Sequence, residues 1–225
     1  MTSARATVVI PAKDEEGIVG SIVDACRPHA DEILVVDGHS RDRTREIAAE
    51  HGARVIEDNG RGKGDALRVA IAAATTEIVV FIDADGSHEP ADIPKLIEPI
   101  RAGQADLVIA SRGKGGSDEL HGTLDQLIRY IGSQLIMLAI NYRWNVRLTD
   151  SQNGFRAIRT DVARSLGLTS NATTIEQEML MKALKRGYRV AEIASHEYER
   201  RWGISKVSVW RLWAVYLWSF VRNLL

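Results

Sequence analysis

The sequence of 225 residues contains a single cysteine, Cys26, and almost no net charge, with 29 basic and 30 acidic residues. One cysteine excludes an intrachain disulfide and a cysteine-rich metal site, which fits a reducing compartment such as the cytoplasm. A net charge of −1 argues against a general polyanion-binding protein, so no nucleic-acid partner is expected. No internal repeat, low-complexity tract or linker rich in proline or glycine divides the chain, which predicts one domain with a C-terminal appendage.

The sequence also lacks a membrane-spanning stretch and a recognisable signal peptide. The N-terminal segment MTSARATVVIPAKDEE has no basic start followed by a long apolar stretch. The longest uncharged run near the C-terminus, from Leu212 to Val221, is well short of the roughly 18–20 residues that cross a bilayer. Three of the five tryptophans nevertheless lie within residues 207–225, where arginines and serines gather on one helical face. We therefore expect an amphipathic helix in a membrane interface, with a core or dimer helix as the alternative.

Short apolar runs alternate with helical patterns in the first half of the sequence. The runs cover residues 7–12, 32–37, 53–58, 77–83 and 105–111, and the helical stretches cover about 15–28, 42–51, 64–75 and 91–102. This alternation predicts an α/β fold with a Rossmann-like, mainly parallel sheet flanked by helices. In the less regular second half we expect helices over 123–141 and 175–187, the latter ending at Gly187, and a strand over 188–195.

Two aspartates, Asp83 and Asp85, follow the run IVVFI with only Ala84 between them. They lie at the carboxyl end of an expected strand, as Asp37 does, and this is the edge where parallel sheets bind ligands. Two carboxylates this close repel each other unless a cation compensates, and Mg²⁺ is usually held by one or two carboxylates plus substrate phosphates. The motif therefore indicates a site for Mg²⁺ or Mn²⁺, with a polar strand end before a helix cap as the alternative.

Seven segments occur in the order seen in a known enzyme family. They are VVIPAKDEE, ILVVDGHSRDRT, GKGDAL, VVFIDADGSHEP, VIASR, DSQNGFRA and GYRVAEI, and together they extend over roughly residues 6–206. In these segments the chain resembles the inverting family 2 glycosyltransferases with the GT-A fold, and especially the polyprenyl-phosphate sugar transferases typified by dolichol-phosphate mannose synthase. The resemblance implies a GT-A domain over residues 1–206, followed by the amphipathic helix over 207–225.

The resemblance implies a site for a GDP- or UDP-sugar at the strand ends. The residues that it assigns to donor binding are Pro11, Ala12, Asp14, Glu15, Asp37, Lys63, Asp65, Asp83, Ala84, Asp85 and Arg112. Asp83 and Asp85 would also bind the metal, which Ser87 could reach through water. For Lys63 and Asp65 the alternative is an ordinary glycine-rich loop in which Asp65 caps the next helix.

The acceptor implied by the resemblance is a polyprenyl phosphate at a membrane surface. The acceptor phosphate would be met by Arg129, Ser133, Arg200 and Lys206. The catalytic assignments are Asp85, Asp150 and Glu176. A hydroxyl acceptor needs a general base, and in relatives that glycosylate hydroxyls a carboxylate near Glu176 has this role, whereas a phosphate is already anionic. Transfer to a soluble or glycan hydroxyl with Glu176 as base is therefore the alternative.

In the family's arrangement the segment DSQNGFRA places Asp150 close to the sugar or the acceptor. A turn with Gly154 in the left-handed conformation is the alternative explanation of that segment. We thus expect a metal-dependent inverting glycosyltransferase that is peripheral at the cytoplasmic face of the membrane, and a homo-oligomer is left open.

Overall fold

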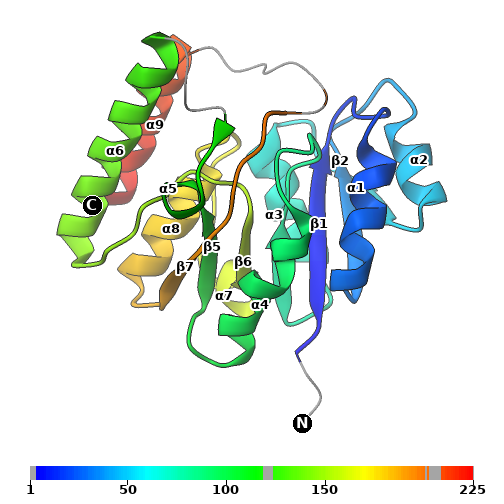
Figure 1. Cartoon of the computed structure of the whole chain (residues 1–225), viewed down its shortest axis with the longest axis horizontal. Helices are drawn as coiled ribbons and strands as arrows, with labels where there is room; N and C mark the ends of the chain where they lie inside the picture. The colour runs from blue at the N-terminus through cyan, green and yellow to red at the C-terminus, as the bar shows by residue number, and fades with distance from the viewer. Residues whose placement is uncertain (1–3, 119–123, 201, 203–208, 225) are drawn as a thin grey trace.

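The structure, a computed structural model, describes residues 4–118, 124–200, 202 and 209–224, with side chains except for 124–130 and 209–215, around one seven-stranded sheet (Figure 1). The strands are β1 (Ala6–Ala12), β2 (Glu32–Asp37), β3 (Arg54–Glu57), β4 (Ile78–Phe81), β5 (Leu107–Ser111), β6 (Arg156–Arg159) and β7 (Val190–Ala194). The helices are α1 (Val19–Cys26), α2 (Thr44–Glu50), α3 (Lys63–Ala73), α4 (Ile93–Arg101), α5 (Arg112–Gly115), α6 (Leu124–Trp144), α7 (Thr160–Ser165), α8 (Ile175–Lys185) and α9 (Val209–Leu224), with short 3₁₀ turns at Arg27–His29 and Pro90–Asp92.

The strands follow the order β3-β2-β1-β4-β6-β5-β7 across the sheet. The first four in this order are parallel, so their carboxyl ends meet at one edge, with Ala12 of β1 beside Asp37 of β2. Of these, β1, β2 and β4 are mainly apolar and buried because helices cover both faces of the sheet, whereas β3 is partly exposed. The α/β fold and the six strands expected from the sequence are confirmed, with boundaries that shift by at most two residues.

The strand β6 runs antiparallel to both of its neighbours and was not expected. Its first residue, Arg156, is paired with Phe81 at the end of β4 and with Ile109 of β5. The loop over residues 150–155 therefore enters the sheet at the same edge where β4 ends. The sequence of β6, RAIR, has an arginine at each end and no apolar run, which is why strand patterning did not reveal it.

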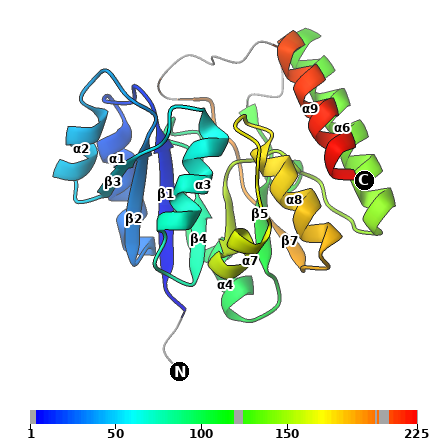
Figure 2. The ribbon, with the colours of Figure 1, turned by 180° about the vertical axis from the view of Figure 1, so that it is seen from behind.

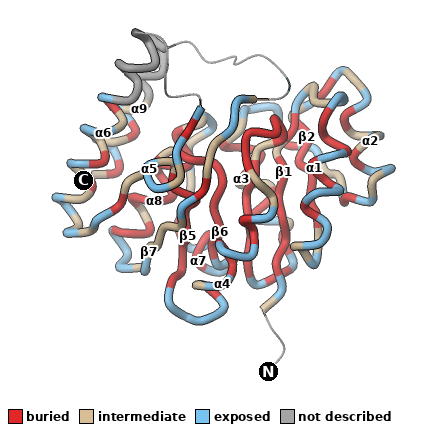
Figure 3. Tube along the Cα trace, viewed as in Figure 1, coloured by how far each residue is buried: buried red, intermediate tan, exposed pale blue. Residues whose placement is uncertain are grey.

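Two apolar layers enclose the sheet (Figures 2 and 3). Successive side chains of a strand point to opposite faces, so Val8 belongs to the layer of α1 and α4, while Val9 belongs to that of α3 and α8. The helix α8 ends before Gly187, whose φ of 75° confirms the predicted glycine at this helix end.

The C-terminal helix α9 lies beside α6 and α8 in both views of the ribbon (Figures 1 and 2). It accounts for residues 209–224 of the amphipathic helix expected over 207–225, and the other three residues lie outside the described part of the chain. Within the described residues, none of the helices combines the length and the apolar character needed to cross a bilayer.

Candidate active site

The carboxyl edge of the sheet brings together acidic and basic side chains from distant parts of the sequence. Asp83 follows β4, Lys63 begins α3, and Glu176 lies in the first turn of α8. Lys63 Nζ is 2.6 Å from Asp83 Oδ1 and 3.0 Å from Glu176 Oε1, so one ammonium group links the two carboxylates. Glu176 is 1% exposed, and its Oε2 has no hydrogen-bond partner among the described residues.

The charge of this cluster fixes the protonation of Lys63 and Asp83. Burial alone would lower the pKa of Lys63, but the charges of Asp83 and Glu176 outweigh it and leave that pKa above its ordinary value. Burial alone would raise the pKa of Asp83, but the charge of Lys63 and a hydrogen bond from His88 hold it well below its usual range. The imidazole of His88 is 3.7 Å from Asp83 Oδ2 and stacks on the ring of Phe155. In the folded protein Lys63 is therefore protonated and Asp83 is ionised.

The second aspartate of the motif, Asp85, is held by its own turn and by a distant arginine. Its Oδ1 accepts hydrogen bonds from the Ser87 backbone N–H at 3.0 Å and from the Ser87 hydroxyl at 2.7 Å. Its Oδ2 lies 3.2 Å from Nη1 of Arg200. Ser87 thus orients Asp85, and Arg200 reaches the aspartate pair from the chain that follows β7.

The donor set of the aspartate pair fits a hard divalent cation. Asp83 pairs with Lys63, and Asp85 pairs with Arg200. Both carboxylates therefore lie where the protein already binds positive charge. The described residues contain no cluster of three or more His, Cys, Asp or Glu side chains that could hold a metal by itself. Two carboxylates suit Mg²⁺ or Mn²⁺, which takes its remaining ligands from water and phosphate oxygens.

Gly154 is required at this site because the backbone passes directly over the ion pair. A Cβ atom at this position would lie 2.8 Å from Asp83 Oδ2 and 2.9 Å from Lys63 Nζ. Gly154 is absent from the residues with positive φ, so the alternative of a left-handed turn is wrong. The glycine provides room for a close approach rather than an unusual backbone angle.

The loop that carries Gly154 is anchored by a fully buried arginine. Arg156 donates to the backbone carbonyl of Asn153 through Nε at 2.9 Å and to that of Glu176 through Nη1 at 2.7 Å. Asn153 in turn donates from Nδ2 to the carbonyl of Ala110 at 2.6 Å. Arg156 therefore joins the loop to the first turn of α8, a role that sequence reasoning missed because no charged partner marks it.

Asp150 and Arg112, both predicted site residues, form a bidentate ion pair with each other. Arg112 Nε is 2.6 Å from Asp150 Oδ2, and Nη2 is 3.0 Å from Oδ1, while Nη1 approaches Glu197 at 3.4 Å. Burial alone would raise the pKa of Asp150, but the charge and hydrogen bonds of Arg112 lower it. The Arg112 guanidinium is thus already engaged by two carboxylates, and its predicted contact with the donor stays a prediction.

The residues predicted to hold the nucleotide lie where β1 and β2 end. Pro11 and Ala12 close β1, and Asp14 follows with a φ of 59°, accepting from the Arg41 backbone N–H at 2.9 Å. Asp37 accepts from the Ser40 N–H at 2.9 Å through Oδ2, whereas its buried Oδ1 has no hydrogen-bond partner among the described residues. The remaining members of the predicted donor set here are Glu15, in the loop between β1 and α1, and Ala84, buried between the two aspartates.

The start of α3 is already covered by the chain around residue 171. The Gly64 N–H donates to the carbonyl of Asn171 at 3.0 Å, so it is not available to an anion. Asp65 accepts from the Asn59 N–H at 2.9 Å and pairs with Arg68 at 2.8 Å. The helix N-cap is Gly62 and makes no side-chain capping bond, so the alternative of Asp65 as the cap is wrong.

The predicted acceptor residues are only partly described. Arg200 lies on Asp85, and Ser133 is half-buried on α6. The side chain of Arg129 and all of Lys206 lie outside what the structure describes.

The chain that follows β7 contacts both the Asp83–Ser87 segment and Gly17, in the loop after β1. The Tyr198 N–H donates to the carbonyl of Ser87 at 2.9 Å, just before Arg200 meets Asp85. The ring of Trp202 then covers Gly17, where a Cβ atom would come within 2.5 Å of Cη2. These contacts therefore join the aspartate pair to the region where β1 ends.

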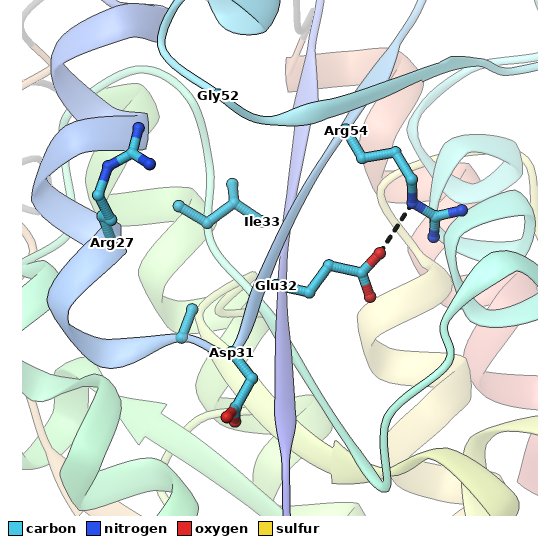
Figure 4. A pocket seen from close by; sticks show the side chains of 7 residues that line it. Arg27, Asp31, Glu32, Ile33, Gly52 and Arg54 are labelled. Atoms are coloured by element: carbon cyan, nitrogen blue, oxygen red, sulfur yellow. Dashed lines mark ion pairs between the residues drawn. The ribbon is translucent and has the colours of Figure 1, made fainter.

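A surface hollow of about 260 Å³ lies away from this site (Figure 4). It is lined by Arg27, Ala30, Asp31, Glu32, Ile33, Gly52 and Arg54. Glu32 begins β2 and Arg54 begins β3, and the two form an ion pair at 2.8 Å. The hollow is therefore at the amino ends of the strands, opposite the edge where this kind of sheet binds ligands.

Comparison with known proteins gives relatives over most of the chain. Low-salt glycan biosynthesis hexosyltransferase Agl6 of Haloferax volcanii is 29% identical over 83% of this chain, which spans only 46% of that protein. Undecaprenyl-phosphate mannosyltransferase of Micrococcus luteus is 33% identical over 91% of this chain and 88% of that protein. Glucosyl-3-phosphoglycerate synthase of Mycobacterium tuberculosis, crystallised with Mn²⁺, UDP and phosphoglyceric acid, matches with a TM-score of 0.75 and 23% identity over 98% of this chain and 78% of that one.

The structural likeness bears on the fold alone, and it confirms the expected GT-A arrangement. Residues 7–167 match the family described as Glycosyl transferase family 2. This match covers more than half of the chain and agrees with the relatives named above. The protein therefore belongs to glycosyl transferase family 2 and is a glycosyltransferase.

Proposed function

We propose that the enzyme transfers a hexose from a GDP- or UDP-sugar to a polyprenyl phosphate at the cytoplasmic face of a membrane. The observation that carries this proposal is the position of Arg200, whose guanidinium lies 3.2 Å from Asp85. A cation suited to an acceptor phosphate thereby stands beside carboxylates suited to a donor metal. The name of the mannosyltransferase relative, which refers to undecaprenyl phosphate, supports the same acceptor class.

On the donor side, Asp83 and Asp85 would hold Mg²⁺ or Mn²⁺. When bound, the metal supplies charge stabilisation for the diphosphate that leaves with the nucleoside. Lys63 adds a permanent positive charge 2.6 Å from Asp83. Asp37, at the end of β2, would supply Oδ1, which has no hydrogen-bond partner in the described part of the chain, to the nucleoside end of the donor.

On the acceptor side, the state of Glu176 favours a phosphate over a hydroxyl. Glu176 is 1% exposed and its Oε1 is paired with Lys63, so a hydroxyl acceptor has little access to this carboxylate. A phosphate oxygen is already anionic and needs no base. In the proposed step this oxygen forms a bond to the anomeric carbon while the bond to the nucleoside diphosphate breaks, which inverts the configuration.

The membrane part of the proposal rests on an exposed apolar surface shared by α6 and α9. On α6 the exposed side chains are Ile131, Leu135, Leu138 and Tyr142, which recur at helical spacing. On α9 they are Leu217, Trp218 and Val221. The two helices lie side by side (Figures 1 and 2), so these side chains belong to one region of the molecule.

The charge of the same two segments indicates an anionic lipid surface rather than a second copy of the chain. Helix α6 contains two arginines, Arg129 and Arg143, and one acidic residue, Asp125, and α9 contains Arg211 and Arg222 and no acidic residue. A second copy would bring like charges together, whereas anionic headgroups attract a basic segment by about 1 kcal/mol per Lys or Arg near the surface. Aromatic side chains such as Tyr142 and Trp218 suit the headgroup boundary.

The test is an incubation of the purified enzyme with radiolabelled GDP-mannose or UDP-glucose, Mn²⁺, and undecaprenyl phosphate in anionic vesicles. We expect labelled lipid in the organic phase, its loss with Asp85→Asn or EDTA, and an inverted anomeric configuration by NMR. Phosphoglyceric acid and free sugars serve as soluble acceptors in parallel. Transfer to soluble acceptors alone would overturn the polyprenyl-phosphate proposal, and loss of all turnover in Glu176→Gln with intact donor binding would favour the hydroxyl alternative.

A further inference from the structure

The C-terminal helix α9 is bonded directly to the chain that starts α8. The Tyr216 hydroxyl donates to the backbone carbonyl of Thr173 at 3.0 Å and lies 3.3 Å from the Thr173 hydroxyl. In the opposite sense, Gln177 Nε2 donates to the backbone carbonyl of Tyr216 at 3.4 Å. These bonds attach the same turn that carries Glu176.

The first turn of α8 depends on such outside contacts for its position. Its N-cap residue, Thr174, makes no side-chain capping bond to the helix. Arg156 holds the Glu176 carbonyl at 2.7 Å, and Lys63 holds the Glu176 carboxylate at 3.0 Å. The bond from Tyr216 to Thr173 holds the amino end of this turn together with the hydrogen bond between the hydroxyls of Ser170 and Thr174 at 2.7 Å.

The side chain of Tyr216 extends from α9 to the chain that starts α8. Burial, followed by the charge of Glu176, raises the pKa of Tyr216, while the charges of Lys63 and Arg112 oppose the shift. Glu176 follows Thr173 by three residues, so the bond from Tyr216 to Thr173 brings the phenol to the start of α8.

We infer that Tyr216 is a positioning residue, which sets the first turn of α8 through Thr173 and thereby fixes how Glu176 holds Lys63 against Asp83. The inference rests on the proposed function and adds to it a mechanical connection between the helix proposed to meet the membrane and the donor site. The path consists of contacts already described, each within hydrogen-bond or ion-pair distance.

The test compares Tyr216→Phe with a matched control, Tyr188→Phe. Tyr188 makes one hydroxyl hydrogen bond, to Ser165 at 3.1 Å, and it lies near the C-terminal end of α8, opposite the end that carries Glu176. We expect Tyr216→Phe to lower kcat about tenfold with little change in the acceptor KM, and the control to match the wild type. Because the effect passes through Glu176, Tyr216→Phe should add nothing in a Glu176→Gln background.

A second measurement does not depend on turnover. Amide hydrogen exchange over residues 173–178 should accelerate in Tyr216→Phe and stay unchanged in Tyr188→Phe. If the wild type transfers no sugar but this difference in exchange is present, the proposed function fails and the positioning role stands. Equal exchange and equal kcat in the two variants, or additive losses in the double variant, would overturn the role of Tyr216. Should Tyr216→Phe fail to fold, Gln177→Leu breaks the other bond between α8 and α9, from Gln177 Nε2 to the Tyr216 carbonyl, and the same comparison tests whether contact with α9 sets this turn.

Discussion

Replacing Gly154 by alanine should damage the metal and donor site through a displacement that the structure defines. The added Cβ would lie 2.8 Å from Asp83 Oδ2, and ordinary contact begins near 3.4 Å, so the carboxylate or the loop has to move by about 0.6 Å. Lys63 cannot simply swing away, because its ammonium group is held between Asp83 and Glu176. The strain adds an overpacking cost of about 1–3 kcal/mol to the free energy of folding.

The functional effect follows from the same displacement. A misplacement of 1 Å at a reacting site costs on the order of 100-fold, so about 0.6 Å should weaken binding of Mn²⁺ with GDP or UDP by about tenfold. The assay is isothermal titration calorimetry with the nucleotide that binds the wild type, together with the thermal midpoint.

The matched control is Gly103→Ala. Gly103 has a φ of 65° and no atom within 4 Å of an added Cβ, so this change strains the backbone by about 1 kcal/mol without touching the site. We expect it to lower the thermal midpoint and leave nucleotide affinity unchanged. Wild-type affinity in Gly154→Ala, with a loss of stability no larger than in the control, would refute the close-approach argument.

Three further predictions concern buried polar groups. The hydrogen bond from Arg189 lowers the pKa of Asp106. The ionised carboxylate therefore stabilises the folded state by about 1 kcal/mol above about pH 4, and this contribution is lost as the pH falls through the folded-state pKa. Between pH 6 and pH 3 the free energy of unfolding measured in urea should therefore fall more steeply in the wild type than in Asp106→Asn. Burial raises the pKa of Cys26 to about 12, so the folded enzyme should resist a thiol reagent at pH 8 and react on unfolding, whereas fast labelling would contradict the burial. Arg156→Met removes the donor from the backbone carbonyls that Arg156 bonds. We expect the free energy of unfolding, measured by chemical denaturation, to fall by about 3 kcal/mol. An unchanged midpoint would show that water replaces the guanidinium.

The strands β1, β2, β4 and β5 could be predicted because each is a run of mainly apolar residues that is buried on both faces. The strand β6 could not, since its buried first residue is Arg156, which satisfies its charge with backbone carbonyls that no sequence pattern marks. The short helices α5 and α7 also lack an apolar period long enough to recognise.

Some residues of the candidate site could be identified from the sequence, whereas the contacts between them could not. Asp83 and Asp85 were identifiable because an acidic pair at the end of an apolar run is unusual. The bridge from Lys63 to Glu176 depends on how α3 and α8 pack, and it joins residues that are far apart in the sequence. The contribution of Tyr216 was hidden for the same reason, because an aromatic residue in an apolar helix gives no sign that its hydroxyl meets another helix.

The antiparallel pairing of β5 with β6 has a consequence for how this enzyme can diversify. Two adjacent, paired strands flank everything from Arg112 to Phe155, so this whole excursion, α6 included, is topologically one very long hairpin connection. Doubling the length of such a connection costs only about 0.6 kcal/mol in closure entropy. The helix proposed to face lipid can therefore vary in length without changing the register of the sheet, provided that Met137 and Ile140, which it places in the core, keep their positions.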